Sequence, residues 1–125
     1  MSHFTTINTQ IRDTDALADA CRELDLPLDT NSTARGYAGA THPGEQVIRL
    51  QGPYDIAVNR QADGTLGFTA DLWQGHVEAE VGKNYSRIKQ LYGVHKTTRE
   101  ARRKGLNVRR RALRNGTIRL QLVAA

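Results

Sequence analysis

The fold is decided by residues 54–72, which read YDIAVNRQADGTLGFTADL. Asp63-Gly64 near the centre is a typical turn dipeptide. Apolar side chains alternate on both sides of this turn, which is the pattern of a half-buried strand. The alternating residues are Tyr54, Ile56 and Val58 before the turn, and Leu66, Phe68, Ala70 and Leu72 after it. The stretch therefore predicts two strands joined by a tight turn.

The residues before this stretch predict a strand and a short helix. Residues 3–11 alternate and are rich in β-branched side chains, which favours a strand. Asp13 or Thr14 then offers an N-cap, and apolar residues recur at helical spacing through residues 14–24 until Pro27. Residues 29–45, which contain three glycines and a proline, predict a long loop or an irregular strand. Val47 to Leu50 predicts a further strand.

The residues after it predict a long helix or a helix pair over 80–104. An apolar stripe recurs about once per turn, at Tyr85, Ile88, Leu91 or Tyr92, and His95. Gly93 is expected to bend or split the helix, and Gly105 to end it. No regular strand–helix alternation supports a parallel sheet. We therefore expect one α+β domain over residues 1–125, with an antiparallel or mixed sheet, a short N-terminal helix and helices mainly on one face.

The chain is expected to close with a C-terminal β-hairpin, whose register depends on the turn. A two-residue turn at Asn115-Gly116 would mix apolar and charged side chains on each face. A three-residue loop, Arg114-Asn115-Gly116, with Gly116 left-handed, shifts the pairing by one residue. This second register, which we prefer, places Arg109, Arg111, Arg119 and Gln121 on the solvent face. It places Val108, Ala112, Ile118, Leu120 and Leu122 on the buried face, with Arg110 near its rim.

Charge is divided unevenly along the chain. The net charge is +5, but residues 1–80 carry five arginines against twelve acids (−7), whereas residues 81–125 carry thirteen cations against one acid (+12). Nine of these thirteen cations are arginines, which suit bidentate recognition of phosphate or carboxylate. We therefore expect an anion- or partner-binding surface at the end of the helix and on the hairpin. Its candidate residues are Lys96, Arg99, Arg102, Arg103, Lys104, Arg109, Arg111 and Arg119.

The class of partner is left open by these residues. An acidic protein surface and a nucleic acid would both meet such a cationic face. Proteins that bind single-stranded nucleic acid usually place aromatic residues among the cations, so that bases can stack on them. Here Tyr85 and Tyr92 lie on the apolar stripe of the helix, where a core role is favoured. A non-enzymatic binding or adaptor module with an acidic partner is the leading interpretation, and an RNA- or DNA-binding protein is the alternative.

The remaining constellations favour structural roles over catalysis. The four histidines are scattered and Cys21 has no neighbouring ligand, so no metal or other cofactor is expected. Asp71, Glu78 and Glu80, beside Trp73 and His76, are the only clustered acids from which an acid–base pair could be built, and their spacing does not select one. A small enzyme centred on Asp71, His76 and Glu78 is therefore the least favoured interpretation. The Gly36-Tyr37-Ala38-Gly39 segment resembles the GxxG loop of KH domains but is expected to serve turns.

Bulk composition limits the location. No apolar run approaches the roughly 20 residues needed to cross a bilayer. The opening residues lack the pattern of a signal peptide. A single cysteine cannot form an internal disulfide, which favours a reducing, cytoplasm-like compartment. The oligomeric state is not fixed by any of these features.

Several segments of the chain resemble a small family of unknown function. They are Met1–Ile7 with Thr9–Asp13, Ala34–Tyr37, Tyr54–Ile56, Gly67–Trp73 and Gly116–Leu120. The family is the conserved hypothetical chloroplast reading frame thirty-five, found in cyanobacteria, red-algal plastid genomes and some other bacteria. The resemblance implies no activity, cofactor or catalytic residue. Members are often encoded near an AAA-type ATPase, which implies a partner or adaptor role, and a plastid-encoded member would lie in the stroma.

Overall fold

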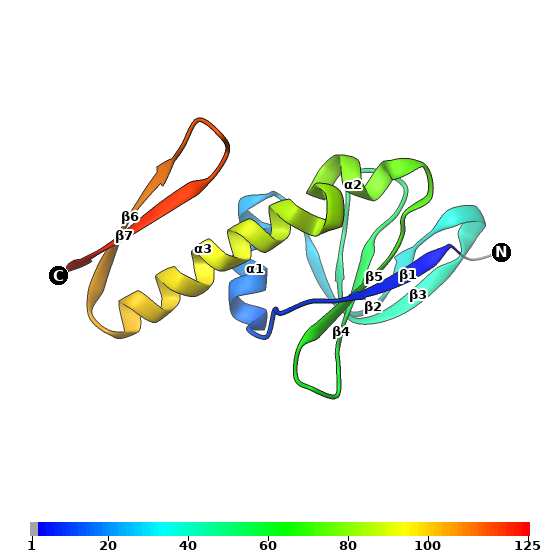
Figure 1. Ribbon diagram of the computed structural model, residues 1–125. Helices are drawn as coiled ribbons and strands as arrows, with labels where there is room; N and C mark the ends of the chain where they lie inside the picture. Colours follow the sequence, from blue (N-terminus) through cyan, green and yellow to red (C-terminus); the bar gives the residue numbers. More distant parts are fainter. Residues whose placement is uncertain (1–2) are drawn as a thin grey trace.

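Two separate antiparallel sheets are joined through helices in the computed structural model, which describes residues 3–125 (Figure 1). Met1 and Ser2, which begin the resemblance given above, lie outside the described residues. The elements in chain order are β1 (Phe4–Asn8), α1 (Thr14–Glu23), β2 (Leu28–Arg35), β3 (Thr41–Ile48), β4 (Ile56–Arg60), β5 (Leu66–Asp71), α2 (His76–Val81), α3 (Ser86–Arg103), β6 (Leu106–Ala112) and β7 (Ile118–Ala124). This is the α+β class expected from the sequence.

The main sheet has the strand order β1-β5-β4-β3-β2, and every pairing in it is antiparallel. The predicted pair of strands is its centre: Ile56 pairs with Ala70 and Val58 with Phe68, and the chain turns at Asp63-Gly64. The first strand, β1, returns to pair with β5, so that Ile7 lies opposite Phe68. Strands close in sequence are therefore neighbours except at β1.

The prediction of a loop or irregular strand over residues 29–45 was wrong for most of that segment. Residues 28–35 and 41–48 form the two longest strands of the sheet, joined by a short 3₁₀ turn at Tyr37–Gly39. The turn is where the GxxG segment lies, so its glycines do serve a turn. Most side chains of β2 are exposed and polar, so no apolar alternation in the sequence indicates this strand. Backbone pairing with β3 holds this edge strand in place.

One face of the sheet carries the hydrophobic core, and the helices cover it. Phe68, Ile56 and Val58 of the sheet are at most 1% exposed. They belong to one cluster with Leu17 and Cys21 of α1. Val77 and Val81 of α2 and Ile88 of α3 complete the helical side of the same cluster. The expectation that helices gather on one face is confirmed.

The helix ends follow ordinary capping chemistry. Asp13 is the N-cap of α1, and its carboxylate accepts the backbone N–H groups of Asp15 and Ala16. The helical region after the sheet is broken at Gly82–Tyr85 and not at Gly93, which lies within α3. Gly82 adopts φ +84°, a conformation that ends α2 at little cost for glycine. Gly105 follows α3 with φ +74°, as expected of a C-terminal glycine.

The C-terminal hairpin has the register that the three-residue loop predicts. Arg111 pairs with Arg119 and Ala112 with Ile118, and Gly116 is left-handed with φ +84°. The face expected to be buried is only partly covered. Val108, Ile118 and Leu120 are half-buried, whereas Ala112 and Leu122 are exposed. The hairpin packs mainly on α3, so there is too little structure behind it to bury the whole face.

Candidate functional site

The cations of α3 that face α1 are paired with acids. Arg99 binds Asp19 through two hydrogen bonds, with N–O distances of 2.5 and 3.0 Å. Lys96 lies 3.4 Å from Asp13 and 3.1 Å from Glu100. The hydrogen bond from Arg99 holds the pKa of Asp19 below its ordinary value. Two of the eight predicted site residues therefore hold α3 against α1.

Glu23, the last residue of α1, connects the hairpin to the contact between α1 and α3, which we call the seam. Arg110 of β6 donates to both of its carboxylate oxygens at 2.8 and 2.6 Å. His95 of α3 lies 2.8 Å from the same carboxylate. The hydrogen bond from Arg110, with a smaller contribution from His95, lowers the pKa of Glu23 from 4.5 to about 2. One carboxylate therefore joins α1, α3 and β6.

An open groove of about 580 Å³ runs along this seam. Its walls mix acids and cations, which is the composition of a polar seam and not of an apolar ligand pocket. The groove brings Arg102 and Arg103 beside the paired residues. It is lined by Asp19, Arg22, Glu23, His95, Thr98, Arg99, Arg102 and Arg103.

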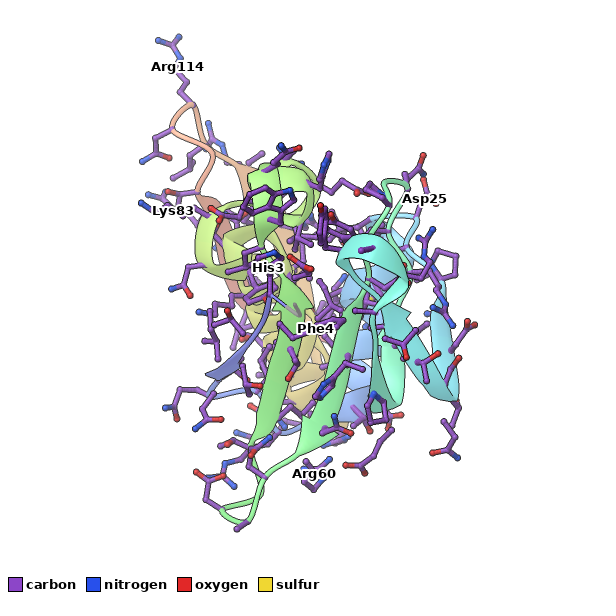
Figure 2. The ribbon with its side chains drawn as sticks, turned by 90° about the vertical axis from the view of Figure 1, so that its right-hand side faces the viewer. His3, Phe4, Asp25, Arg60, Lys83 and Arg114 are labelled. Atoms are coloured by element: carbon purple, nitrogen blue, oxygen red, sulfur yellow. The ribbon has the colours of Figure 1, made fainter. Side chains whose placement is uncertain are left out.

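The other six predicted site residues carry unpaired charge. Within residues 3–125, no acid lies within 4.0 Å of the charged groups of these six side chains, which we call the free cations. Arg111 and Arg119 are direct cross-strand neighbours on the hairpin face that looks away from the apolar one, and Arg109 shares that face. Figure 2 shows Arg114 at the hairpin tip, extending away from the rest of the chain. The free cations are Arg102, Arg103, Lys104, Arg109, Arg111 and Arg119.

The acidic residues that α1 contributes to the seam were not identified from the sequence. Asp15, Asp19 and Glu23 recur every four residues along α1, which places them on one helix face. Lys96, Arg99 and Arg103 are spaced three and four residues apart, so they also share one face of α3. Matching these two stripes would have indicated that part of the basic segment is used inside the chain.

No hydrogen bond joins the acid–base candidates Asp71, His76 and Glu78 to one another within residues 3–125. Asp71 is completely buried, and its two oxygens accept the backbone N–H groups of Tyr37 and Trp73 at 2.8 and 2.9 Å. His76 instead packs edge-on against Tyr54, with ring centroids 5.3 Å apart. The Asp71 carboxylate therefore fixes two turns, and it holds the exposed Trp73 in place beside His3, whose ring stacks on it at 4.9 Å.

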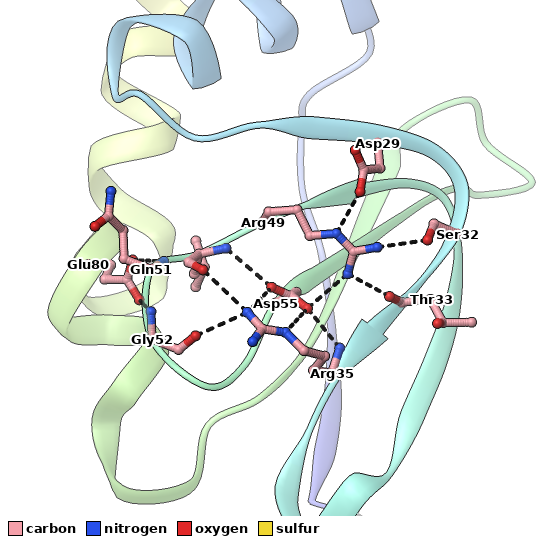
Figure 3. Close-up of polar contacts among 10 residues, drawn as sticks. Asp29, Ser32, Thr33, Arg35, Arg49, Gln51, Gly52, Asp55 and Glu80 are labelled. Carbon is pink, nitrogen blue, oxygen red and sulfur yellow. Dashed lines mark hydrogen bonds and ion pairs between the residues drawn. The ribbon is translucent and has the colours of Figure 1, made fainter.

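A second buried carboxylate, that of Asp55, lies at the same end of the sheet, directly before β4 (Figure 3). Asp55 is 0% exposed and receives two hydrogen bonds from the Arg35 guanidinium, both 2.8 Å, and one of 3.0 Å from Arg49. Burial alone would raise the pKa of Asp55, but these hydrogen bonds, led by Arg35, bring it below the ordinary value. Arg35 also donates to the backbone of Leu50 and Gly52. The network holds β2, β3 and the loop before β4 together.

The described part of the chain contains neither a cluster of metal ligands nor an accessible thiol. No cluster of three or more His, Cys, Asp or Glu side chains is placed to hold a metal ion within residues 3–125. Cys21 is 1% exposed, and burial raises the pKa of its thiol to about 12. Its position in the core is the one expected from the sequence.

The fold and these contacts define a class: an α+β domain with an antiparallel sheet, a charged helix–helix seam and an attached arginine-bearing hairpin. No helix among the described residues has the length and apolar character needed to span a bilayer. The chain belongs to the family described as "Protein of unknown function (DUF1257)", whose model matches residues 20–121. Comparison with curated proteins finds no match, and comparison with solved structures finds none either.

Proposed function

We propose that this chain is a non-enzymatic binding or adaptor module that docks an acidic protein surface through its free cations. The proposal rests on the contrast between two groups of cations in residues 96–119, those with acidic partners and those without. Lys96, Arg99 and Arg110 have acidic partners within the chain, whereas the free cations have none among the residues that the structure describes. Like charges placed directly opposite on a sheet are destabilising. The Arg111–Arg119 pair therefore carries a cost that an acidic partner would remove.

The resemblance to the plastid reading frame thirty-five family supports a more specific version of this proposal. Members of that family are often encoded near an AAA-type ATPase, which makes such an ATPase the first candidate partner. A cytoplasmic location, or the plastid stroma for a plastid-encoded chain, agrees with this partner and with the single buried cysteine.

A nucleic acid is the second candidate, and the shape of the hairpin favours it. A two-stranded antiparallel ribbon fits into the major groove of DNA, and arginine is the commonest reader of guanine there. Strands β6 and β7 form such a ribbon, with Arg109, Arg111 and Arg119 on one face. The exposed aromatic residues lie elsewhere, at Tyr37 and Trp73, so stacking with single-stranded bases is not supported at the hairpin.

The test is affinity purification of the intact chain with and without nuclease, using a charge-reversal variant of the hairpin. The variant replaces Arg109, Arg111 and Arg119 by Glu. We expect a nuclease-resistant partner that binds the wild type and is lost from the variant. A partner that disappears with nuclease, and whose affinity falls steeply with salt because counterions are released on binding, would assign the face to nucleic acid.

A matched control keeps the result specific. It makes the same change in net charge at three exposed arginines that do not line the groove, by Arg12→Glu, Arg60→Glu and Arg87→Glu. This control is expected to retain the partner. An unchanged partner set in the hairpin variant, or equal loss in both variants, would show that the hairpin face is not the docking site.

A further inference from the structure

The main sheet has an open edge at β1. Within residues 3–125 this strand pairs only with β5, and no described strand lies on its other side. Thr9 donates its backbone N–H to Leu66, and the ladder alternates from there, so Ile7 and Thr5 also direct their backbone groups toward β5. The backbone groups of Thr6 and Asn8 therefore point outward. Both side chains are exposed, as they would be at an uncovered edge.

Two hollows lie side by side along this edge. The first, of about 160 Å³, is walled mainly by apolar residues, including Ile7 of β1, Leu72 and Val77. The second, of about 280 Å³, lies between residues 8–11 and α3, where Lys89 and Tyr92 line it. Residues 7 and 9 of an extended chain are separated by about 6.7 Å, which is the spacing of alternate side chains in a strand. A strand added to this edge could place two side chains of one face into the two hollows.

Tyr85, which lines the first hollow, is unusual in the surroundings of its hydroxyl group and in its backbone conformation. It is 2% exposed, and its hydroxyl has no hydrogen-bond partner within the described residues. Buried hydroxyl groups in folded proteins are nearly always hydrogen-bonded. Its backbone is left-handed, with φ +59°, directly after Asn84 with φ +57°. Such a conformation in a bulky residue is costly and is concentrated at binding sites.

The charge at the rim indicates the chemistry of an occupant. Lys83 lines the first hollow and Lys89 the second. Neither ammonium group has an acidic side chain within 4.0 Å in residues 3–125, whereas Lys96 further along the helix has two. Glu78 of α2 also lines the first hollow. The two lysines would favour acidic residues beside the apolar side chains of an added strand.

We propose that the β1 edge is a second docking site, which takes an extended segment of a partner protein as a sixth strand. The segment carries two apolar side chains two or four residues apart, with Asp or Glu next to them. Its backbone pairs with Thr6 and Asn8, and one apolar side chain enters the hollow of Ile7 and Tyr85. Strand addition of this kind takes affinity from main-chain hydrogen bonds and specificity from pockets for alternate side chains. The site shares no residue with the cationic hairpin and does not depend on its function.

The test is selection of a random 12-residue peptide library on the intact protein, followed by hydrogen exchange on the complex. We expect enriched peptides with the apolar and acidic pattern above. They should slow exchange of the Thr6 and Asn8 amides at least tenfold. Failure to enrich any peptide above background would overturn the proposal, as would enriched peptides that leave both amides unprotected.

Variants at one position separate the backbone from the side chain. Asn8→Pro removes the outward N–H without removing a bond to β5, and proline is tolerated on such edges. It should weaken the selected peptides at least tenfold, whereas Asn8→Ala should stay within twofold. Lys83→Glu with Lys89→Glu should weaken them, and the hairpin charge-reversal variant should bind normally. A wild-type dimer that Asn8→Pro abolishes in sedimentation would assign the edge to a second copy of this chain and refute a foreign partner.

Discussion

The Glu23–Arg110 contact is expected to hold the hairpin on the helices, and Glu23→Gln tests it. The pKa of Glu23 falls from 4.5 to about 2 in the folded chain. Each pH unit between two such values is worth about 1.4 kcal/mol, so linkage sets an upper limit of about 3.4 kcal/mol. The side chains of Arg110 and Glu23 are 40% and 31% exposed, and solvent screening reduces this limit. We expect Glu23→Gln to lower the free energy of unfolding by about 1–2 kcal/mol at pH 7.

The pH dependence has a defined sign. Because the folded pKa is the lower one, the contribution of Glu23 is fully present above its ordinary pKa of 4.5 and is lost as the pH falls toward 2. At pH 3 about 40% of the value at pH 7 should remain. The difference between wild type and variant should shrink accordingly, although both become less stable as other carboxylates are protonated.

The assay is urea unfolding at pH 7 and pH 3, followed by circular dichroism. Arg110→Gln and the double variant complete a cycle, from which a coupling of about 1 kcal/mol or more is expected at pH 7. Asp25→Asn removes the same charge two residues away, at a side chain with no acidic or basic partner within the described residues, and should change stability by less than about 0.5 kcal/mol. A loss for Glu23→Gln that is equal at both pH values, or a coupling near zero, would refute the reasoning.

Three further predictions concern the interior. Asp55→Ala should lower the free energy of unfolding by about 3–5 kcal/mol in the same assay, because it leaves two arginines without their buried partner; a loss below about 1 kcal/mol would count against the network. Cys21 should react with a thiol reagent at pH 8 at least 100-fold more slowly in the native protein than in urea, because it is buried and its pKa is about 12; comparable rates would contradict its core position. Gly82→Ala should destabilise by about 1–2 kcal/mol because φ is +84° and the new methyl group would meet Ser86. At Gly93, inside α3, the added methyl group would meet open space, so Gly93→Ala should stabilise the protein by about 0.5–1 kcal/mol. A stabilising Gly82→Ala together with a destabilising Gly93→Ala would refute the assignment of the helix break to Gly82.

Much of the fold could be predicted from local pattern. The alternation around Asp63-Gly64, the Asp13 cap and the hairpin register all follow from neighbouring residues, and the structure has each of them. Of strands β2 and β3, only the end of β3 near Val47 was predicted, because the polar side chains of the edge strand β2 and of the first part of β3 leave no periodicity. The helix break was misplaced for a related reason. A glycine inside a helix is tolerated, so only the left-handed φ of Gly82 distinguishes it from Gly93.

The sequence could predict which residues carry the positive charge of the candidate site, but not which of them are paired with acids of the same chain. Sequence places Lys96 and Arg99 in the same basic run as Arg102 and Arg109. Only the packing of α3 on α1 shows that the first two are paired with Asp13 and Asp19, whereas Arg102 and Arg109 have no acidic partner in the described part of the chain. The two buried carboxylates, Asp55 and Asp71, could not be recognised either, because Arg35 lies 20 residues from Asp55 in the sequence and the partners of Asp71 are backbone groups.

The pairing of β1 with β5 also has a consequence for synthesis of the chain. Ile7 lies opposite Phe68, 61 positions later, so β1 has no partner until the end of β5 has left the ribosome. At typical synthesis rates of about 5–20 residues per second, that wait is about 3–12 s. During this time both edges of β1 are unpaired, and an unpaired strand invites pairing with other chains. Nascent chains stalled between residues 20 and 70 should therefore depend on chaperones more than chains stalled after residue 75.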